Sequence, residues 1–292
     1  MRGFGFAVAG VLSRVRHLLS ALSPCLLFLV LPCVARADFM YADFSSISGL
    51  QLNGIGAGVD NVLQITGGPP TGAAGSAWFA TKQFIADGFS TTFQFRITNP
   101  SGIEDDSGEP GGDGFAFVSQ NTSLNALGNG GAGIGYDPIP NSVAVEFDMF
   151  HNGPKTFNLG DTNGNHINIH TLGTAPNSAS EPPFSTASIG NSGLLPVDMS
   201  DGAIHTVRIS YVPPIVSVFL DDLVTPRLTV SLAEAPLPSL EDGLSWVGFT
   251  SGIAAASQNH DILNWSFSEI PEPSTVALLA MAALGLLFYR GK

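Results

Sequence analysis

Carboxylate, amide and imidazole side chains gather in one part of this chain, between Val143 and His170. In Val143-Ala-Val-Glu-Phe-Asp-Met-Phe-His-Asn152, apolar residues alternate with Glu146 and Asp148. If this segment is a β-strand, alternation puts both carboxylates on the face opposite the valines. Two adjacent negative charges repel each other, and a cation between them relieves that repulsion. The pattern therefore favours a cation site on the polar face of a strand.

A second polar row follows in His166-Ile-Asn-Ile-His170. Alternation places the two isoleucines on one face and His166, Asn168 and His170 on the other, so an imidazole can join the carboxylates from a neighbouring strand. Carboxylates with one imidazole suit a Mn²⁺-type ion, whereas carboxylates with an amide oxygen and a backbone carbonyl suit Ca²⁺. The residues are compatible with two ions, and equally with a polar, solvent-facing strand that binds none.

The elements that must position these residues also alternate with a period of two, which indicates strands. The predicted strands are Thr92–Thr98, a strand through Phe115 and Phe117, Val143–Met149, Val207–Tyr211, Ile215–Leu220, Leu228–Leu232, Trp246–Thr250 and Ile262–Phe267. Turns rich in Gly, Pro, Asn and Ser separate them, and no segment of 38–270 reads as a long amphipathic helix. The sequence therefore predicts one all-β sandwich over residues 38–270.

Composition excludes several classes of protein. The 292 residues are 44% hydrophobic and 12% charged, with 20 Phe, so the chain can bury a large core and is not disordered. The formal net charge of −13 and the lack of a Lys/Arg cluster argue against nucleic-acid binding. An acidic surface favours divalent cations over anionic partners.

The first 37 residues are predicted to be a signal peptide. Arg2, Arg14 and Arg16 precede the apolar run Leu18–Val34, and Ala35-Arg36-Ala37 forms an A-x-A cleavage site. Both cysteines, at positions 25 and 33, lie inside this segment. The exported protein is thus expected to fold without a disulfide.

The C-terminal segment, residues 271–292, begins with Pro271-Glu272-Pro273 and continues through the apolar stretch Ser274–Tyr289 to Arg290. This order resembles the PEP-CTERM sorting signal of Gram-negative bacteria, which an exosortase-type enzyme processes. The resemblance implies an apolar sorting helix and a transient anchor in the inner membrane. A simple C-terminal anchor is the alternative.

Glu146-x-Asp148-x-Phe150-x-Asn152, with a later Asp161 and His166, resembles the metal-binding segment of legume-type (L-type) lectins. Further similar segments occur in the same order as in that family, at Gly112–Phe117, Trp246–Thr250 and His260–Phe267. The resemblance implies a concanavalin-like jelly-roll β-sandwich. It also implies a transition-metal site at Glu146, Asp148, Asp161 and His166, and a Ca²⁺ site at Asp148, the Phe150 carbonyl, Asn152 and Asp161.

The same resemblance implies a carbohydrate site. Asp113 would accept hydrogen bonds from two sugar hydroxyls, Asn152 would donate one, and Phe150 would stack on the sugar ring. Gly131 is the expected source of a backbone N–H, and the Gly112–Asp113 peptide is expected to be cis. Histidines 170, 205 and 260 are interpreted as structural.

One departure from the family concerns Asp161. Nine positions separate it from Asn152, which is longer than the usual spacing, so the loop between them is remodelled. Asn158, Asn163 or a water molecule could replace Asp161 as a ligand.

Two rivals to a lectin follow from the same residues. Some glycoside hydrolases on this type of sandwich also carry Glu-x-Asp, but retaining hydrolysis needs a second carboxyl group about 5–5.5 Å away. Here Met149, Phe150, His151 and Asn152 follow instead of that acid. The other rival is a structural matrix protein with a decayed sugar site.

The expected protein is an exported, non-enzymatic binder of cell-surface or extracellular polysaccharide. Its expected place is the cell surface or the extracellular matrix. A homo-oligomer is compatible with this interpretation.

Overall fold

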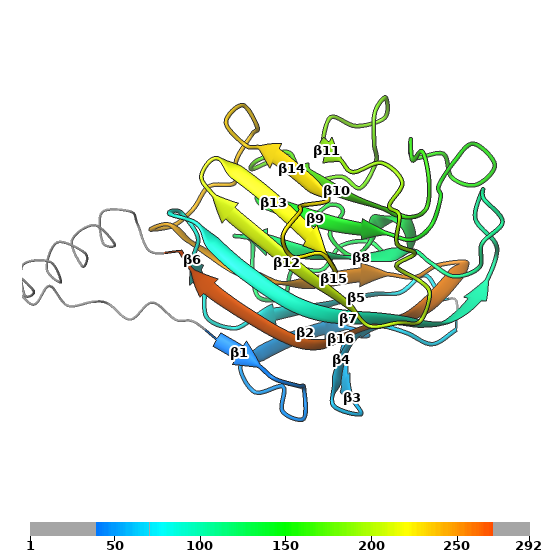
Figure 1. Cartoon of the computed structure of the whole chain (residues 1–292), viewed down its shortest axis with the longest axis horizontal. Helices are drawn as coiled ribbons and strands as arrows, with labels where there is room; N and C mark the ends of the chain where they lie inside the picture. The colour runs from blue at the N-terminus through cyan, green and yellow to red at the C-terminus, as the bar shows by residue number, and fades with distance from the viewer. Residues whose placement is uncertain (1–38, 70, 271–292) are drawn as a thin grey trace, which may run out of the picture. The chain divides into compact units, whose positions relative to one another are not determined.

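The computed structural model describes residues 39–69 and 71–270, and the segments interpreted as signal peptide and sorting helix lie outside them. The described chain forms two antiparallel sheets (Figure 1). The first sheet has the order β14 (Leu228–Ser231), β13 (Ile215–Leu220), β12 (His205–Val212), β7 (Phe89–Gly102), β16 (Ala256–Glu269), β4 (Val62–Thr66) and β3 (Ala57–Val59), with β1 (Phe39–Tyr41) paired to β16. The second has the order β11 (Ser188–Asn191), β10 (His166–Thr171), β9 (Ser142–Asp148), β8 (Gly114–Gln120), β15 (Leu244–Gly252), β5 (Ala74–Phe79) and β2 (Leu50–Gly54), with β6 (Gln83–Phe84) paired to β15.

The predicted all-β sandwich is confirmed. Each predicted strand is present, and Ile215–Leu220 has the bounds of β13. The one helical element in the described part of the chain is a short 3₁₀ turn, η1 (Gly131–Gly133). Sequence alternation missed β1 to β6 and β11, which are short or rich in small and polar residues. Within residues 39–69 and 71–270, no helix has the length and apolarity to cross a membrane.

Aromatic side chains from both sheets form the core between them. Phe93 of β7 meets Phe249 of β15 with ring centroids 5.0 Å apart. Phe95 of β7 lies at the same distance from Phe115 of β8, and Phe115 stacks on Phe147 of β9 at 4.7 Å. Each fully buried Phe contributes about 1.5–3 kcal/mol of stability by leaving water. Such packing stabilises a fold whose residues 38–270 contain no cysteine.

The second sheet is covered on both faces. On the face away from the core, loop residues such as Ile134, Tyr136 and Ala179 pack against Ala116 of β8 and Ala144 of β9. As a result every residue of β8 and of β10 is buried. Polar side chains on this face are therefore enclosed by loops, which removes the alternative of a solvent-facing polar strand.

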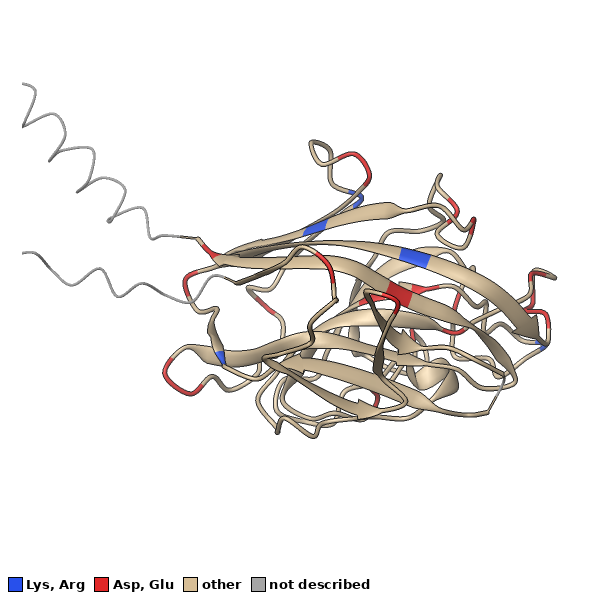
Figure 2. Cartoon of the chain, turned by 90° about the horizontal axis from the view of Figure 1, so that it is seen from below, with Lys and Arg blue, Asp and Glu red and all other residues tan. Residues whose placement is uncertain are grey.

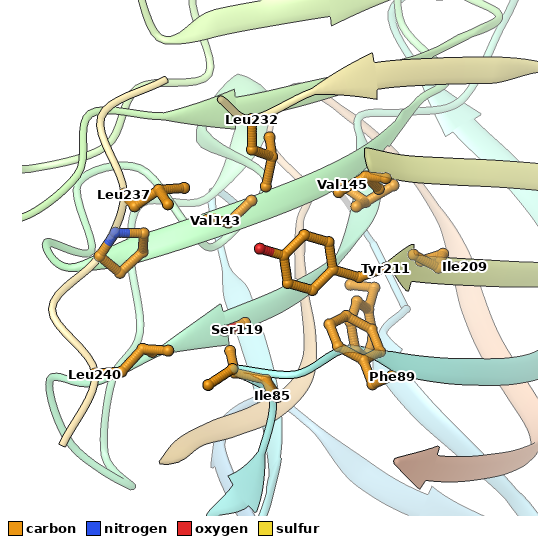
Figure 3. Close-up of a pocket in the computed structure, with 14 residues that line it drawn as sticks. Ile85, Phe89, Ser119, Val143, Val145, Ile209, Tyr211, Leu232, Leu237 and Leu240 are labelled. Carbon is orange, nitrogen blue, oxygen red and sulfur yellow. The ribbon is translucent and has the colours of Figure 1, made fainter. Parts of the chain in front are cut away.

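An apolar cavity of about 220 Å³ lies between the sheets (Figure 3). Val143 and Val145 line it from β9, and the ring of Tyr211 projects into it (Figure 3). Because Glu146 is on the opposite face of β9, this cavity is separate from the cluster of polar residues. Its apolar lining lacks the convergent polar groups that a carbohydrate requires.

Candidate functional site

The order β8, β9, β10 brings together residues that are far apart in the sequence. Asp148, the last residue of β9, pairs with Gly114 at the start of β8 and with His166 at the start of β10. Asp113 therefore precedes β8 at the sheet edge where β9 ends and Asn152 follows. The candidate site lies at this edge of the second sheet.

Three of the predicted metal ligands, Glu146, Asp148 and His166, point their ligand atoms toward one point, and Asp161 lies beside them. Glu146, Asp148 and His166 are buried, and one ligand atom from each lies within 4.8 Å of the others. His166 Nδ1 is 2.9 Å from the carbonyl oxygen of Asn163, which can only accept a hydrogen bond. Nδ1 thus carries a proton, so Nε2, which lies 3.1 Å from Glu181 Oε1, is the ring nitrogen that would bind an ion. The geometry of this group fits a transition metal.

The Tyr136 hydroxyl holds Glu146 in place, and His170 lies next to it. The Tyr136 hydroxyl donates to Glu146 Oε2 at 2.5 Å, and His170 Nε2 lies 3.5 Å from Oε1. Burial and the adjacent Glu146 carboxylate raise the pKa of Tyr136 well above its usual value, so the phenol stays a donor. His170 thus lies beside a metal ligand, as a structural neighbour. Tyr136 comes from a covering loop, and no sequence pattern predicted its role.

The remodelled loop after β9 places Asp161 beside Asn152. The Asn152 N–H donates to Asp161 Oδ2 at 3.0 Å, and the Leu159 N–H donates to the Asn152 carbonyl at 2.9 Å. Asn158 is exposed, and the Asn163 side chain accepts a hydrogen bond from the Asn165 N–H. Asp161, unlike Asn158 and Asn163, is buried next to the site, although it lies outside the converging group.

The buried carboxylates are electrostatically unbalanced. Burial, followed by the charges of Asp161 and Glu146, raises the pKa of Asp148 well above its usual value. Burial, followed by the Glu146 charge, raises the pKa of Asp161 to about 8. Among the described residues, the ion pairs of this cluster involve histidines and no Lys or Arg. A divalent cation would supply the missing positive charge, so the residues fit the metals that the sequence implies.

Several buried polar atoms beside this cluster have no hydrogen-bond partner in the described chain, among them both ring nitrogens of His170. Two others are Asp113 Oδ2, an acceptor, and Asn152 Nδ2, a donor, in residues only 5% and 3% exposed. An unpaired buried polar atom costs about 1–3 kcal/mol, which a ligand with hydroxyl groups can recover. Burial also raises the pKa of Asp113 to about 7. The peptide between Gly112 and Asp113 is cis, as expected.

Phe150 and Gly131 are placed near the site but differ in detail from expectation. A Cβ on Gly112 would lie 2.7 Å from Phe150 Cδ2, so only glycine allows this packing. The Phe150 ring is 2% exposed and offers little surface for stacking on a sugar in this conformation. A Cβ on Gly131 would lie 3.8 Å from Asp113 Oδ2, yet the Gly131 N–H already donates to the Ile253 carbonyl at 3.1 Å. Both sugar-binding roles stay predictions.

The pKa shifts predict an unusual dependence of stability on pH in the absence of metal. The native chain holds protons on Asp113, Asp148 and Asp161 at pH values where the unfolded chain has lost them. These raised pKa values contribute stability below about pH 4, which is lost as the pH rises through about 7 to 8. In EDTA, the melting temperature is therefore expected to fall by roughly 5–10 °C between pH 5 and pH 8.

If these residues form a calcium site, calcium should reverse this trend, because the ion would bind the ionised carboxylates. The difference in melting temperature between calcium and EDTA is expected to grow with pH. Thermal denaturation followed by circular dichroism at several pH values measures both effects. A calcium effect that is equal at pH 5 and pH 8 would contradict the assignment.

Comparison with known proteins identifies the class. Residues 36–278 match the legume lectin domain, and residues 269–292 match the PEP-CTERM protein-sorting motif. Similar solved structures include lectin I-B4 from Griffonia simplicifolia, with a TM-score of 0.61 and 21% identity over 80% of this chain and 100% of that one. Lectin II from Ulex europaeus has a TM-score of 0.58 and 24% identity over 80% of this chain and 97% of that one.

Similar curated proteins are also lectins or contain lectin domains. The match to truncated lectin 2 of Medicago truncatula is 30% identical over 65% of this chain and 64% of that protein. An L-type lectin-domain receptor kinase of Arabidopsis thaliana, S.7, is 30% identical over 61% of this chain, and the match spans only 26% of that protein. A second, VII.1, is matched over 36% of its length.

The antiparallel sandwich, with buried carboxylates and an imidazole at one sheet edge, defines the chain as a protein of the lectin class. Such a domain supports carbohydrate binding. The chain belongs to the legume lectin domain family, and it carries a sorting motif that indicates export in Gram-negative bacteria.

Proposed function

We propose that the protein is an exported, calcium-dependent lectin that binds glycans of cell-surface or extracellular polysaccharide. The observation that carries this proposal is the pair of unpartnered atoms, Asp113 Oδ2 and Asn152 Nδ2. An acceptor and a donor on one sheet edge are what a sugar's vicinal hydroxyl groups require. Because both atoms are buried in a region of low dielectric, each hydrogen bond to a sugar hydroxyl is stronger than it would be in water.

The metals would hold these two side chains in place. In the proposed arrangement Asp148, Asp161, the Asn152 amide oxygen and the Phe150 carbonyl bind Ca²⁺. Glu146, Asp148, Asp161 and His166 bind a transition metal such as Mn²⁺. With its amide oxygen on calcium, Asn152 would direct Nδ2 toward the sugar. Calcium supplies charge and rigidity to the loops, and the protein's own side chains contact the glycan.

The geometry gives no support to the glycoside-hydrolase alternative. Glu146 and Asp148 are the acids that such an enzyme would use, and both are buried beneath the covering loops. Glu146 accepts a hydrogen bond from the Tyr136 hydroxyl, and Asp148 Oδ1 accepts one from the Phe150 N–H at 2.8 Å. Their burial and these hydrogen bonds support a role as ligands of an ion rather than as acids that act on a polysaccharide chain.

A glycan array tests the proposed function. The exported domain is expected to bind a defined set of glycans in calcium and manganese, and to lose that binding in excess EDTA. Restoring calcium should restore the signal. A domain that is folded and metal-loaded but binds no glycan would favour the structural matrix role.

We also propose that both ends are removed during export. Cleavage would occur near Ala37 and within the Pro-Glu-Pro segment, after a transient stay in the inner membrane, and would leave a domain of about residues 38–270. The sorting motif at 269–292 supports an exosortase-type partner. Mass spectrometry of protein from an exosortase-bearing host should find neither terminus, whereas a mature chain that retains Tyr289–Lys292 would leave only a plain anchor.

Figure 2 shows few Lys and Arg segments and many acidic ones in loops, in keeping with an exported acidic domain.

A further inference from the structure

A network of buried polar side chains connects the two sheets next to the proposed sugar site. It consists of Gln258 and His260 of β16, Thr66 of β4 and Ser251 of β15, each at most 1% exposed. His260 Nδ1 lies 2.8 Å from Thr66 Oγ1, and Thr66 Oγ1 lies 2.6 Å from Ser251 Oγ. The network ends at the backbone carbonyl of Gly114, which accepts a hydrogen bond from the Ser251 hydroxyl at 2.7 Å.

The direction of each hydrogen bond in this network follows from the one before it. The Gly114 carbonyl can only accept, so the single hydroxyl proton of Ser251 points to it. Ser251 Oγ must then accept from Thr66, which uses its own single proton in that bond, and Thr66 must accept from His260 Nδ1. His260 therefore carries its proton on Nδ1 and leaves Nε2 as an acceptor, 3.4 Å from the amide nitrogen of Gln258. Burial lowers the pKa of His260 to about 3, in keeping with a neutral ring.

The network contacts the loop of Asp113 on both sides of that residue. After Asp113, the Ser251 hydroxyl binds the carbonyl of Gly114. Before it, a Cβ on Gly111 would lie 2.5 Å from Gln258 Oε1, so the amide side chain packs directly against the backbone of Gly111. The φ of Gly111 is +94°, a conformation that favours glycine. The two contacts therefore bracket the segment that carries the proposed sugar ligand.

The backbone of Asp113 decides where its carboxylate points. The Asp113 N–H donates to the Gly252 carbonyl at 3.2 Å, and the Asp113 carbonyl accepts from the Met149 N–H at 3.0 Å. The carboxylate oxygen Oδ2 is buried without a partner in the described chain. A binding group that is already in place before the ligand arrives gives a higher affinity, because less conformational freedom is lost on binding.

We propose that His260 is a positioning residue for Asp113, which acts through Thr66 and Ser251 as a neutral ring with its proton on Nδ1. This inference rests on the sugar site of the proposed function and adds the residues that hold its loop. His260 does not contact the sugar. Loss of one hydrogen bond in the network would let the loop shift and would lower the affinity for glycan. The proposed calcium ligands Asn152 and Asp161 lie in a different loop, after β9, and would keep their ion.

The proton on Nδ1 is tested on the intact domain. Nitrogen NMR of the protein with isotope-labelled histidines distinguishes a ring protonated on Nδ1 from one protonated on Nε2 and from an imidazolium. We expect His260 to be neutral and protonated on Nδ1 at neutral pH, and the spectrum of His260→Gln identifies its signals. A proton on Nε2, or a charged ring, would overturn the inference.

The positioning role is tested by glycan affinity. Thr66→Val keeps the shape of threonine without its hydroxyl group, and Thr66→Ser keeps the hydroxyl group. Thr91→Val makes the same change at another buried threonine of the same sheet, which is hydrogen-bonded to Ser266 and Trp265, and is the matched control. We expect Thr66→Val to bind a glycan selected on the array about tenfold more weakly and Thr66→Ser to recover most of the affinity. All three variants should keep the calcium-dependent increase in melting temperature.

The outcomes separate this inference from the proposed function. If the intact domain binds no glycan, the proposed function is wrong and this inference fails with it. If the intact domain binds glycan and Thr66→Val binds as tightly as Thr91→Val, only the positioning role is wrong. A Thr66→Val domain that also loses the calcium-dependent increase would show a general structural role and overturn the inference. Should Thr66→Val not fold, Ser251→Ala, which removes the hydrogen bond to Gly114, takes its place in both measurements.

Discussion

Replacing Asp113 with Asn is expected to weaken glycan binding by at least about 100-fold. Hydrogen bonds to a charged group contribute about 1.5–3 kcal/mol each, and the proposed carboxylate accepts two of them, while each 1.4 kcal/mol changes affinity tenfold. Isothermal titration with a glycan selected on the array measures the loss. Asp113→Ala should have an effect at least as large.

The same variant should keep its metal-dependent stability. Asp113 lies beside the proposed calcium ligands but is not one of them, and its burial already raises its pKa to about 7, so the folded chain gains little from its charge. Asp60→Asn, in the exposed turn between β3 and β4, makes the same chemical change and serves as the control. Normal glycan binding by Asp113→Asn would show that the proposed sugar site is wrong even though the fold is right.

Replacing Asp148 is expected to remove both metal-dependent stability and glycan binding. Asp148 pairs with His166 and with Gly114 in the two neighbouring strands, and the proposed function makes it a ligand of both ions. An ion present at 100 to 1,000 times its dissociation constant stabilises the native state by about 2.7–4.1 kcal/mol. For a domain of this size, that corresponds to an increase in melting temperature of roughly 5–15 °C.

Calorimetry in EDTA and in calcium measures this increase directly. The intact domain should show it, and Asp148→Ala and Glu146→Ala should not. His205→Ala is the control. His205 lies in β12 of the other sheet and contacts the loop residues Asp201 and Asp221, so its loss can lower the melting temperature, but the calcium-dependent increase should remain. Equal melting of the intact domain in EDTA and in calcium would rule out the proposed stabilisation by metal.

The sequence by itself determined the strands that carry the site and the composition of their faces. Alternation with a period of two is a local property of the backbone, so Val145, Phe147 and Met149 could be assigned to the core and Glu146 to the opposite face without knowledge of any neighbour. The structure confirms that assignment. The spacing of motifs, together with the resemblance, was enough to predict the fold class.

The tertiary structure decided which polar groups are buried, paired or left free. Loops distant in sequence cover the second sheet, so Asp148 is enclosed rather than solvated, and the Gly131 N–H is already bound to Ile253. Glu181 lies fifteen residues beyond His166 in an irregular loop, where no periodic pattern could place it. Desolvation and hydrogen-bond pairing depend on contacts between residues far apart in the chain. The sequence can therefore name the groups of this site, but only the folded chain shows which of them remain available to an ion or a sugar.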